Sequence, residues 1–336
     1  MHRIWIIILL LYTGFALNAQ DIHFSQYNSS PLNLNPALSG KFEGDHRFIA
    51  NQRNQWSSIT VPYRTYAFSY DTKVHKIPEW KSVIGVGMQI NSDRAGDGDF
   101  GTTQIKLSPA IHKDIKGDST LIASFGFNVN FNQHSINFDA FYFGNQFDGN
   151  RFDATLPHNE IFAEDNLNYI DFALGAAVFF SYKDIPFNVS IAWNHLNKPE
   201  QSFFSEYGVS LSRKFNVSAD SYLSINEDID LFPGIVWYRQ GKFNELNIGG
   251  ILRKAIDDYK FRNIYFGGWM RARDAGILML GIDYQNFNVG ISYDINFSKL
   301  RAASNGRGGM ELSLIYIFSN PRPYDVPYHR QCPVFM

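Results

Sequence analysis

Large apolar residues occupy every second position of residues 287–298. They are Phe287, Val289, Ile291, Tyr293, Ile295 and Phe297, and the positions between them hold Asn288, Gly290, Ser292, Asp294, Asn296 and Ser298. Successive side chains of a β-strand point to opposite faces, so this pattern predicts a strand with one apolar and one polar face. About twelve residues at about 3.3 Å each, tilted by about 40°, rise about 30 Å, which suits a bilayer. A soluble β-sandwich could bury the same apolar face, so the neighbouring segments must distinguish a sandwich from a membrane barrel.

The same alternation recurs along most of the chain. It predicts strands at residues 46–55, 63–71, 82–91, 102–113, 120–132, 169–182, 187–194, 205–214, 230–240, 243–253, 259–271, 276–284 and 310–318. With the first stretch this makes about 14 strands, an even number at the spacing of an antiparallel meander. The inward-facing positions are small and polar, whereas the solvent face of a sandwich is richer in Lys and Glu. We therefore expect an all-β protein, a transmembrane antiparallel up-and-down β-barrel.

The connections between these strands have unequal lengths. If the first strand starts in the periplasm, the outer connections include the long residues 133–166 and the Gly-rich residues 299–309. The periplasmic connections include residues 183–186 and the turn at residues 285–286. Short periplasmic turns and longer outer loops are typical of outer-membrane barrels. The short outer turns near Gly241 and Arg273 and the long inner stretch at residues 215–229 depart from this pattern.

Composition fits the same class. The chain has 30 Phe, 18 Tyr and 6 Trp, 16% aromatic residues in all, as in a barrel with aromatic girdles or a lectin-like β protein. The net charge of −2 gives no electrostatic basis for binding nucleic acid. Cys332 is the only cysteine, so an exported chain of this size folds without internal disulfides, which argues against a small stapled secreted fold.

Residues 1–19 have the pattern of a secretory signal peptide. A short basic region precedes an apolar core at residues 4–11, and Ala19 offers a small residue for cleavage. We expect the mature chain to start at Gln20 or Asp21. The alternative is an uncleaved anchor helix, but the apolar core is short and no stop-transfer pattern follows it. Later in the chain no apolar run approaches the roughly 18 residues of a spanning helix.

The mature chain is expected to have three parts. Residues 20–45, rich in Asn, Ser and Pro, form an N-terminal periplasmic arm or a plug of the lumen. Residues 46–319 form the outer-membrane barrel, in which residues 133–166 are a long extracellular loop. Residues 320–336 form a short C-terminal periplasmic tail.

No motif predicts catalytic chemistry. Asp93, Asp97 and Asp99 could cup a calcium ion, but they lack a bidentate Glu, and a turn favours Asp and Gly in any case. The Gly-Arg-Gly-Gly run at residues 306–309 lacks the Lys-Ser/Thr of a phosphate loop. The His residues lack metal-ligand spacing, no Gly-x-Ser-x-Gly elbow is present, and Cys332 lacks the setting of a nucleophile. We therefore expect no enzyme activity, no cofactor and no metal site.

One candidate site lies near the end of the first predicted strand. In the simpler interpretation, Trp56 belongs to an interfacial girdle, and Arg53 is satisfied inside the lumen by the arm around Asn35 and Pro36. In the sharper hypothesis, the arm, Arg53 and Trp56 form a plug or a docking point for a partner. We prefer the simpler interpretation and keep both.

The start of the mature chain carries an ordered series of motifs. They are Asp21, His23-Phe24-Ser25-Gln26-Tyr27, Pro31-Leu32-Asn33-Leu34-Asn35-Pro36-Ala37-Leu38-Ser39-Gly40, Arg47, Asn51-Gln52-Arg53-Asn54-Gln55-Trp56, Thr65-Tyr66 and Ser69-Tyr70-Asp71. Val289-Gly290-Ile291-Ser292-Tyr293-Asp294 and Cys332-Pro333 continue the series. The series resembles the PorP/SprF family of type IX secretion membrane proteins from gliding and secreting Bacteroidetes. The chain departs from the family pattern in its last residues, Val334-Phe335-Met336, where a basic residue and a terminal Phe are expected.

The resemblance implies a non-enzymatic outer-membrane component of the type IX secretion system. Such a barrel assists the export or surface attachment of partner proteins such as gliding adhesins. The implied partners are the lipid bilayer, a secreted adhesin or its C-terminal domain, and other secretion components, including periplasmic ring lipoproteins. Some family members serve one partner protein, and others serve the whole secretion machine.

Two other functions stay open from the residues alone. An outer-membrane channel for small hydrophobic molecules would need an apolar pocket in the lumen and a gap in the wall. A soluble lectin or glycosidase would need paired carboxylates in a cleft, and the spacing of Asp and Glu singles out no pair.

Overall fold

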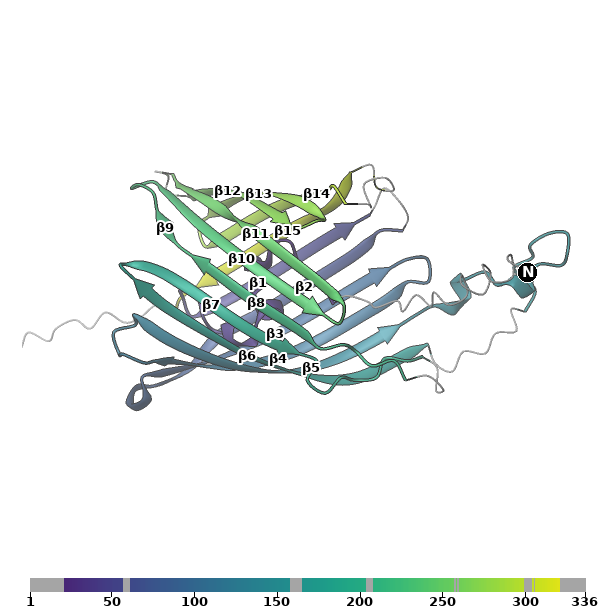
Figure 1. Ribbon diagram of the computed structural model, residues 1–336, viewed down its shortest axis with the longest axis horizontal. Helices are drawn as coiled ribbons and strands as arrows, with labels where there is room; N and C mark the ends of the chain where they lie inside the picture. Colours follow the sequence, from purple (N-terminus) through teal and green to yellow (C-terminus); the bar gives the residue numbers. More distant parts are fainter. Residues whose placement is uncertain are drawn as a thin grey trace, which may run out of the picture.

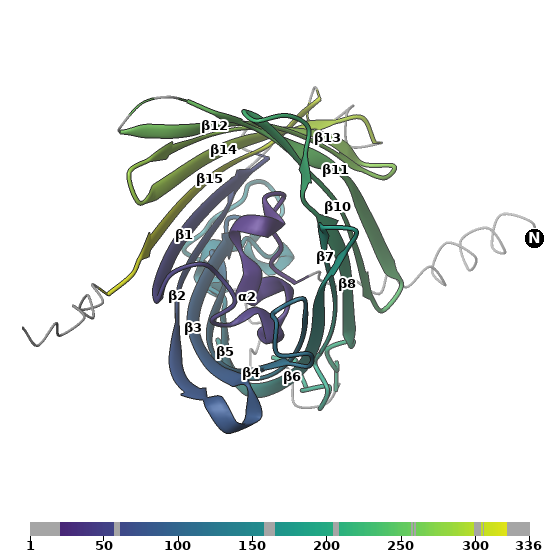
Figure 2. The same cartoon turned by 90° about the vertical axis from the view of Figure 1, so that its left-hand side faces the viewer.

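The computed structural model describes residues 21–56, 61–157, 165–203, 208–256, 258, 260–298, 304 and 306–320. The signal peptide expected at the start of the chain and nearly all of the expected tail lie outside these residues. Figure 1 shows strands running obliquely around one barrel, and Figure 2 looks into it from one end. No helix in the described residues is long and apolar enough to cross a membrane.

The wall is one sheet of 15 strands. They are β1 (His46–Gln55), β2 (Tyr63–Ile77), β3 (Ser82–Ala95), β4 (Phe100–Asp114), β5 (Leu121–Ser135), β6 (Asn166–Tyr182), β7 (Ile185–Asn194), β8 (Lys214–Ser221), β9 (Leu223–Ser224), β10 (Ile229–Gln240), β11 (Phe243–Ala255), β12 (Phe261–Arg271), β13 (Ala275–Tyr284), β14 (Phe287–Asn296) and β15 (Arg307–Phe318). Successive strands pair antiparallel, and β1 closes the ring by pairing with β15. Since β8 and β9 both pair with β10, they share one position, which gives a closed barrel of 14 strands. The predicted fold class is confirmed.

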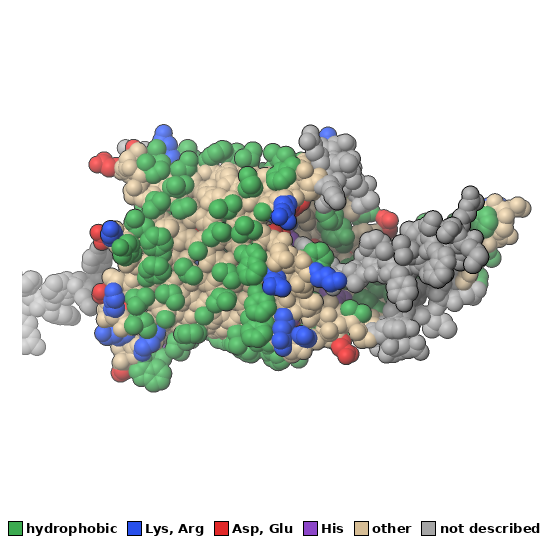
Figure 3. Space-filling model, viewed as in Figure 1, with side chains coloured by type: hydrophobic (Ala, Val, Ile, Leu, Met, Phe, Trp, Pro, Cys, Tyr) green, Lys and Arg blue, Asp and Glu red, His purple; other side chains and the backbone are tan. Residues whose placement is uncertain are grey.

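β14 shows how the alternating pattern builds the wall. Its apolar Ile291 and Tyr293 are each 42% exposed, whereas Ser292 and Asp294 between and beside them are buried on the inner face. Figure 3 shows apolar side chains spread over the middle of the wall, with charged side chains toward its two ends. Such a belt suits the hydrocarbon of a bilayer, where the closed ladder leaves no backbone group unpaired.

The strand predicted at residues 205–214 is wrong. Among the described residues 208–213, the amide of Leu211 donates to the carbonyl of Pro199 at 2.9 Å. This stretch therefore pairs with its own connection and not with the wall. Its apolar residues alternate in the sequence as those of a wall strand do, but they do not share one face in the structure, because Val209 is exposed and Leu211 is buried.

β8 and β9 fill that wall position instead. Phe215, Val217 and Ala219 of β8 face outward. They are fewer than the outward apolar residues of β14, and Ala219 is small. The pattern is therefore weaker, and the expectation of a long inner connection at residues 215–229 is wrong. The connection from β9 to β10 is only residues 225–228.

The connections give the barrel two unlike ends. Residues 136–165, 195–213 and 297–306 join strands at one end, which we call the long-loop end. In Figure 1 the teal segment after β5 extends beyond the wall at this end. The opposite end, the short-turn end, lacks such long connections: its turns run from two residues, 183–184 and 285–286, to six, 115–120, and it holds the start of β1 and the end of β15. The long-loop end also has one two-residue turn, 241–242.

Residues 21–44 lie inside the barrel, and we call them the lumen segment (Figure 2). They form three short helical turns, η1 (Tyr27–Ser29), α2 (Pro31–Leu34) and η2 (Pro36–Leu38). A proline begins both α2 and η2, where its fixed φ is already helical and its missing N–H costs nothing.

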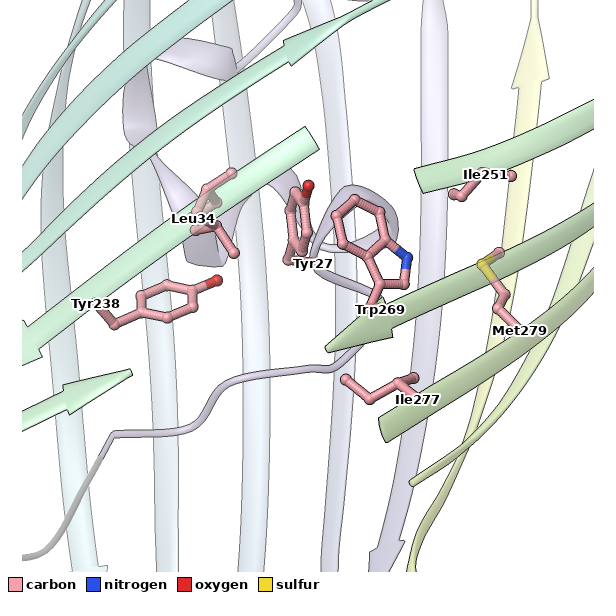
Figure 4. Close-up of a cluster of buried hydrophobic side chains, with 8 residues drawn as sticks. Tyr27, Leu34, Tyr238, Ile251, Trp269, Ile277 and Met279 are labelled. Carbon is pink, nitrogen blue, oxygen red and sulfur yellow. The ribbon is translucent and has the colours of Figure 1, made fainter. Parts of the chain in front are cut away.

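The lumen segment shares an apolar core with one side of the wall. Tyr27 and Leu34 pack in a buried cluster with wall side chains of β10 to β13 (Figure 4). These wall side chains are Val236, Tyr238, Ile251, Trp269, Ile277 and Met279. The inner face is therefore partly apolar here, because it packs against protein and not against water, and the expectation of a small polar lining does not cover this side.

Candidate functional site in the barrel lumen

The lumen segment crosses the barrel from one end to the other. At the long-loop end its first described residue, Asp21, contacts His195 and Gln240. At the short-turn end the amide of Asp45, which follows the segment, donates to the carbonyl of Phe318 at 3.1 Å. The candidate site is the surface between this segment and the inner wall.

Two glycines support the middle of the lumen segment. Gly126 in β5 and Gly175 in β6 stand directly opposite each other in the sheet. A Cβ atom on Gly175 would overlap the side-chain oxygen of Asn35, and one on Gly126 would overlap the backbone at Pro36. The Asn35 amide nitrogen also donates to one carbonyl in β6, at 3.1 Å, and one in β7, at 3.0 Å. The wall therefore has space for the segment only because these positions lack side chains.

A second close approach lies toward the short-turn end. Gly40 has φ +74°, a conformation that favours glycine, and its amide donates to Asp71 at 2.7 Å. Arg47 binds the same carboxylate through two hydrogen bonds of 2.9 and 2.7 Å. A Cβ atom on Gly85 would overlap the carbonyl of Ser39. The buried Asp71 charge is thus balanced by Arg47 while it fixes the segment.

Charged side chains gather on the inner wall near the long-loop end. This inner charge cluster consists of Arg53 of β1, Glu245 of β11, Arg271 of β12, Asp294 of β14 and Glu311 of β15. Arg53 Nε lies 3.1 Å from Glu311, and Arg271 Nη1 lies 3.0 Å from Asp294. Arg271 Nε lies 3.4 Å from Glu245. Every charge has a partner, as burial requires, since an unpaired buried charge is very costly.

Glu311 binds the lumen segment through two successive backbone amides. Its carboxylate oxygens accept the amide of Ser25 at 2.7 Å and the amide of Gln26 at 2.9 Å. The Gln26 side chain donates to Ser292 at 3.0 Å and accepts from Ser313 at 2.8 Å. These contacts tie the segment to β14 and β15, and hydrogen bonds to a charged partner contribute about 1.5–3 kcal/mol each.

Other members of the inner charge cluster also bind the lumen segment close to Ser25. The hydroxyl of Ser25 donates to Asp294 at 2.9 Å and accepts from Arg271 at 2.6 Å. Arg53 donates to the carbonyl of His23 at 2.5 Å. The cluster therefore contacts the backbone and the short side chain of Ser25, and its Glu245 also lies 3.3 Å from the His23 ring.

A separate set of contacts holds Asp21, the first residue of the lumen segment, and we call this set the Asp21 latch. The His195 ring nitrogens lie 2.6 Å from Asp21 and 2.6 Å from Asp171, and Lys214 lies 3.5 Å from Asp21. His195 belongs to the connection after β7 and not to a wall strand. Burial alone would lower the pKa of His195, but Asp21 and Asp171 outweigh it and raise the pKa to about 9. The ring is therefore charged at neutral pH. Burial alone would raise the pKa of Asp21, but His195 and Lys214 hold it well below its usual range.

The residues singled out from the sequence do not form one site. Arg53 lies inside the lumen, but it contacts the start of the lumen segment and not Asn35 or Pro36, so the expected partner is wrong. Asn35 and Pro36 lie at mid-lumen against the glycines of β5 and β6. Trp56 follows β1, and its ring packs edge to face with Tyr63 at 4.9 Å. Their roles as plug or docking contacts stay a prediction.

Sequence reasoning missed four members of the inner charge cluster, Glu245, Arg271, Asp294 and Glu311. The available signal was a charge at an inward-facing position of a strand that otherwise places Gly, Ser or Asn inward. Glu311, for example, stands between Met310 and Leu312, which both face outward. Such a charge inside a barrel needs a partner of opposite sign.

Asp93, Asp97 and Asp99 do not converge on a metal site. Asp93 accepts a hydrogen bond from Thr65 at 2.5 Å, and Asp99 pairs with Arg94 at 2.9 Å on an exposed turn. Within the described ranges no group of three His, Cys, Asp or Glu side chains is arranged to hold a metal ion.

Comparison with solved structures shows the fold. The chain is similar to CymD, a monoaromatic hydrocarbon channel, at 8% identity and a TM-score of 0.50, over 87% of this chain and 93% of that one. It is also similar to the toluene transporter TbuX of Ralstonia pickettii, at 8% identity and a TM-score of 0.49, over 86% and 94% of the two chains. A FadL homologue from Pseudomonas aeruginosa matches at 10% identity and a TM-score of 0.45, over 84% and 93%. The likeness to CymD supports a shared barrel fold, and an identity of 8% carries no shared function.

Comparison with protein sequences gives the family. No curated protein sequence matches the chain. A family model described as type IX secretion system membrane protein PorP/SprF matches residues 16–316. The match takes in the lumen segment, the inner charge cluster and nearly the whole wall. The chain therefore belongs to the PorP/SprF family of type IX secretion system membrane proteins.

Proposed function

We propose that this protein is a non-enzymatic outer-membrane component of the type IX secretion system that assists the export or surface attachment of partner proteins such as gliding adhesins. The family match over residues 16–316 is the observation that carries the proposal. The closed barrel with its apolar outer belt supports a place in the outer membrane, with the long-loop end outside and the short-turn end in the periplasm.

We further propose that the lumen segment acts as a plug that stays in place. Its contacts with the wall on nearly every side support this role. Two cavities inside the barrel, one beside Asp21 and His23 and one beside Lys106 and His195, have volumes of about 20 Å³ each. That volume suits about one water molecule, which supports a filled lumen and a barrel that serves as a platform for partners.

Exposed aromatic side chains support a docking role for the long-loop end. Phe141, Tyr142, Phe147 and Phe152 lie in the connection after β5, and Tyr142 is 77% exposed. The rings of Tyr142 and Phe152 pack edge to face at 4.8 Å. Exposed apolar groups beyond a membrane belt suit a protein partner, in this proposal a secreted adhesin or its C-terminal domain. Periplasmic ring lipoproteins would meet the short-turn end.

Deleting the gene and comparing surface and culture-fluid proteins tests the proposed function. Loss of one adhesin from the surface would mark a dedicated accessory, and loss of many secreted proteins would mark a component that the whole machine needs. Unchanged surface and culture-fluid fractions would contradict a secretion role.

A double variant of the loop tests the docking end separately. Replacing Tyr142 and Phe152 by Ser should reduce the adhesin retained at the surface severalfold, because it removes the exposed aromatic pair while leaving the wall intact. The matched control is Phe125→Leu, which changes an exposed aromatic residue in the lipid-facing belt. If the loop variant retains as much adhesin as the control, the docking end is wrong while the secretion role stands.

A channel for small hydrophobic molecules is the less well supported alternative. The apolar inner face of β10 to β13 is what such a channel would need, but Tyr27 and Leu34 already occupy it. The likeness to the hydrocarbon channel CymD concerns the fold alone.

A further inference from the structure

A cavity of about 480 Å³ lies on the outside of the wall at the long-loop end. Its lining includes Lys198, Leu211, Arg213, Phe215 and Arg239. These residues come from the connection between β7 and β8, the start of β8 and the end of β10. The cavity is much larger than the two cavities of the lumen, and neither the lumen segment nor the inner charge cluster lines it.

The sheet register turns this surface toward the membrane. Arg239 of β10 stands opposite Phe215 of β8, and Phe215 stands opposite Trp193 of β7. On β10 the flanking Tyr238 and Gln240 are buried on the inner face, whereas Arg239 is exposed. Strand residues next to one another face opposite ways, so Arg239, Phe215 and Trp193 form one row on the outside.

The row combines flat aromatic rings with positive charge. Phe215 and Trp193 are stacked with their centroids 5.3 Å apart, and the Arg213 guanidinium lies 5.2 Å from the Trp193 ring centre. Aromatic side chains are typical of the level where hydrocarbon meets headgroups, and Arg and Lys are typical of the headgroup level just beyond. The strands end here, so the cavity lies at that boundary.

Within the described residues, no carboxylate balances the positive charge of the cavity. Arg213 donates to the carbonyl of Leu196 at 3.2 Å. Across the described part of the chain, no carboxylate lies within ion-pair distance of Lys198, Arg213 or Arg239. In contrast, both arginines of the inner charge cluster are paired with carboxylates.

We propose that this cavity binds the phosphate-bearing headgroup of a membrane lipid in the leaflet at the long-loop end. Arginine binds phosphate oxygens through two parallel hydrogen bonds, and Arg213, Arg239 and Lys198 surround a space large enough for a headgroup. The acyl chains of the lipid would lie along the Trp193 and Phe215 rings. This inference rests on the proposed function in one respect, the choice of leaflet. If the long-loop end faces outward, as proposed, the lipid is the phosphorylated glycolipid of the outer leaflet.

Native mass spectrometry of the full chain in non-ionic detergent tests the site. The probes are lipid A, which is a phosphorylated glycolipid, the same lipid after enzymatic removal of its phosphates, and inorganic phosphate. The intact lipid should bind at one site, and the dephosphorylated lipid should bind at least tenfold more weakly. The double variant Arg213→Gln with Arg239→Gln should bind the intact lipid about thirtyfold more weakly, since each cation near a membrane surface contributes about 1 kcal/mol.

The matched control is the double variant Arg64→Gln with Lys254→Gln. Both residues are exposed and face outward, Arg64 near the long-loop end of the opposite wall and Lys254 near the short-turn end. An equal loss of lipid binding in the two double variants would overturn the proposal, because the lipid would then be attracted by positive charge anywhere on the barrel and not by this cavity. Equal binding of the dephosphorylated lipid, or full competition by millimolar inorganic phosphate, would also overturn it.

Folding and function are controlled separately. Circular dichroism of each variant should show the strand content of the parent, which separates lost binding from lost structure. The binding assay uses the purified protein alone, so a secretion defect or its absence in cells does not affect its result. Stronger binding of phosphatidic acid than of the glycolipid would keep the phosphate site but reverse the assigned leaflet, and with it the orientation in the proposed function.

Discussion

Replacing Glu311 by Gln should release the start of the lumen segment while the wall stays closed. The Glu311 carboxylate accepts the amides of Ser25 and Gln26 at 2.7 and 2.9 Å and pairs with Arg53 at 3.1 Å. A glutamine keeps one acceptor oxygen, but it turns an NH₂ group toward one of these donors and leaves the buried Arg53 charge short of a partner.

The magnitude follows from the burial of this pair, since both side chains are 2% exposed. Removing one partner of a buried, hydrogen-bonded ion pair costs about 3–5 kcal/mol. If the whole cost falls on local opening, the amides of Ser25 and Gln26 should exchange about 10²- to 5 × 10³-fold faster. Hydrogen exchange measured by mass spectrometry in detergent resolves this difference, with peptides of β5 as an internal reference.

The control variant is Glu227→Gln, an exposed carboxylate in the short turn before β10. It should exchange like the parent protein throughout the lumen segment. If Glu311→Gln folds and its Ser25 and Gln26 amides exchange at the parent rate, the inner charge cluster does not hold the segment, and the reasoning above is refuted.

Three further predictions concern the same segment. Arg53→Ala should speed hydrogen exchange around residues 23–26, and unchanged protection would count against a plug. Gly175→Ala should lower the thermal midpoint by circular dichroism, because overpacking costs about 1–3 kcal/mol, whereas Gly276→Ala, whose Cβ would meet no atom within 4 Å, should not. The pKa of His195 is raised from 6.5 to about 9, so its stabilisation of the Asp21 latch is complete below pH 6.5 and is lost as the pH rises through about 9. Exchange around Asp21, corrected for its intrinsic pH dependence, should rise across that range, and His195→Gln should abolish the rise.

The wall was predictable because lipid imposes a simple rule on every strand. Each second residue of β14 must be apolar where it meets hydrocarbon, and the sequence of Phe287 to Ile295 meets that rule without exception. β8 escaped prediction because Ala219 and Val217 give a weaker contrast, and because the loop before it alternates equally well while pairing with itself. A two-residue alternation of apolar side chains does not by itself predict which strand an extended segment pairs with.

The lumen contacts were beyond sequence reasoning for a different reason. Ser25 and Glu311 are 286 residues apart, and no local pattern links an amide at one end of the chain to a carboxylate at the other. The glycines had a visible signal, since Gly126 and Gly175 stand at inward positions of otherwise regular strands. That signal predicts a close approach of some backbone but does not identify Asn35 and Pro36 as the backbone that approaches.

The pairing of Arg53 with Glu311 bears on how the molecule is made. These residues stand opposite each other where β1 meets β15, so the first wall strand is joined there to the last. A chain is synthesised from its N-terminus, so β1 can pair with β15 only after the last strand has been made. Ring closure and the anchoring of Ser25 and Gln26 by Glu311 thus both require the final strand, and contacts so distant in sequence form slowly. Until then β1 exposes a free edge, and a nascent copy needs shielding from its neighbours.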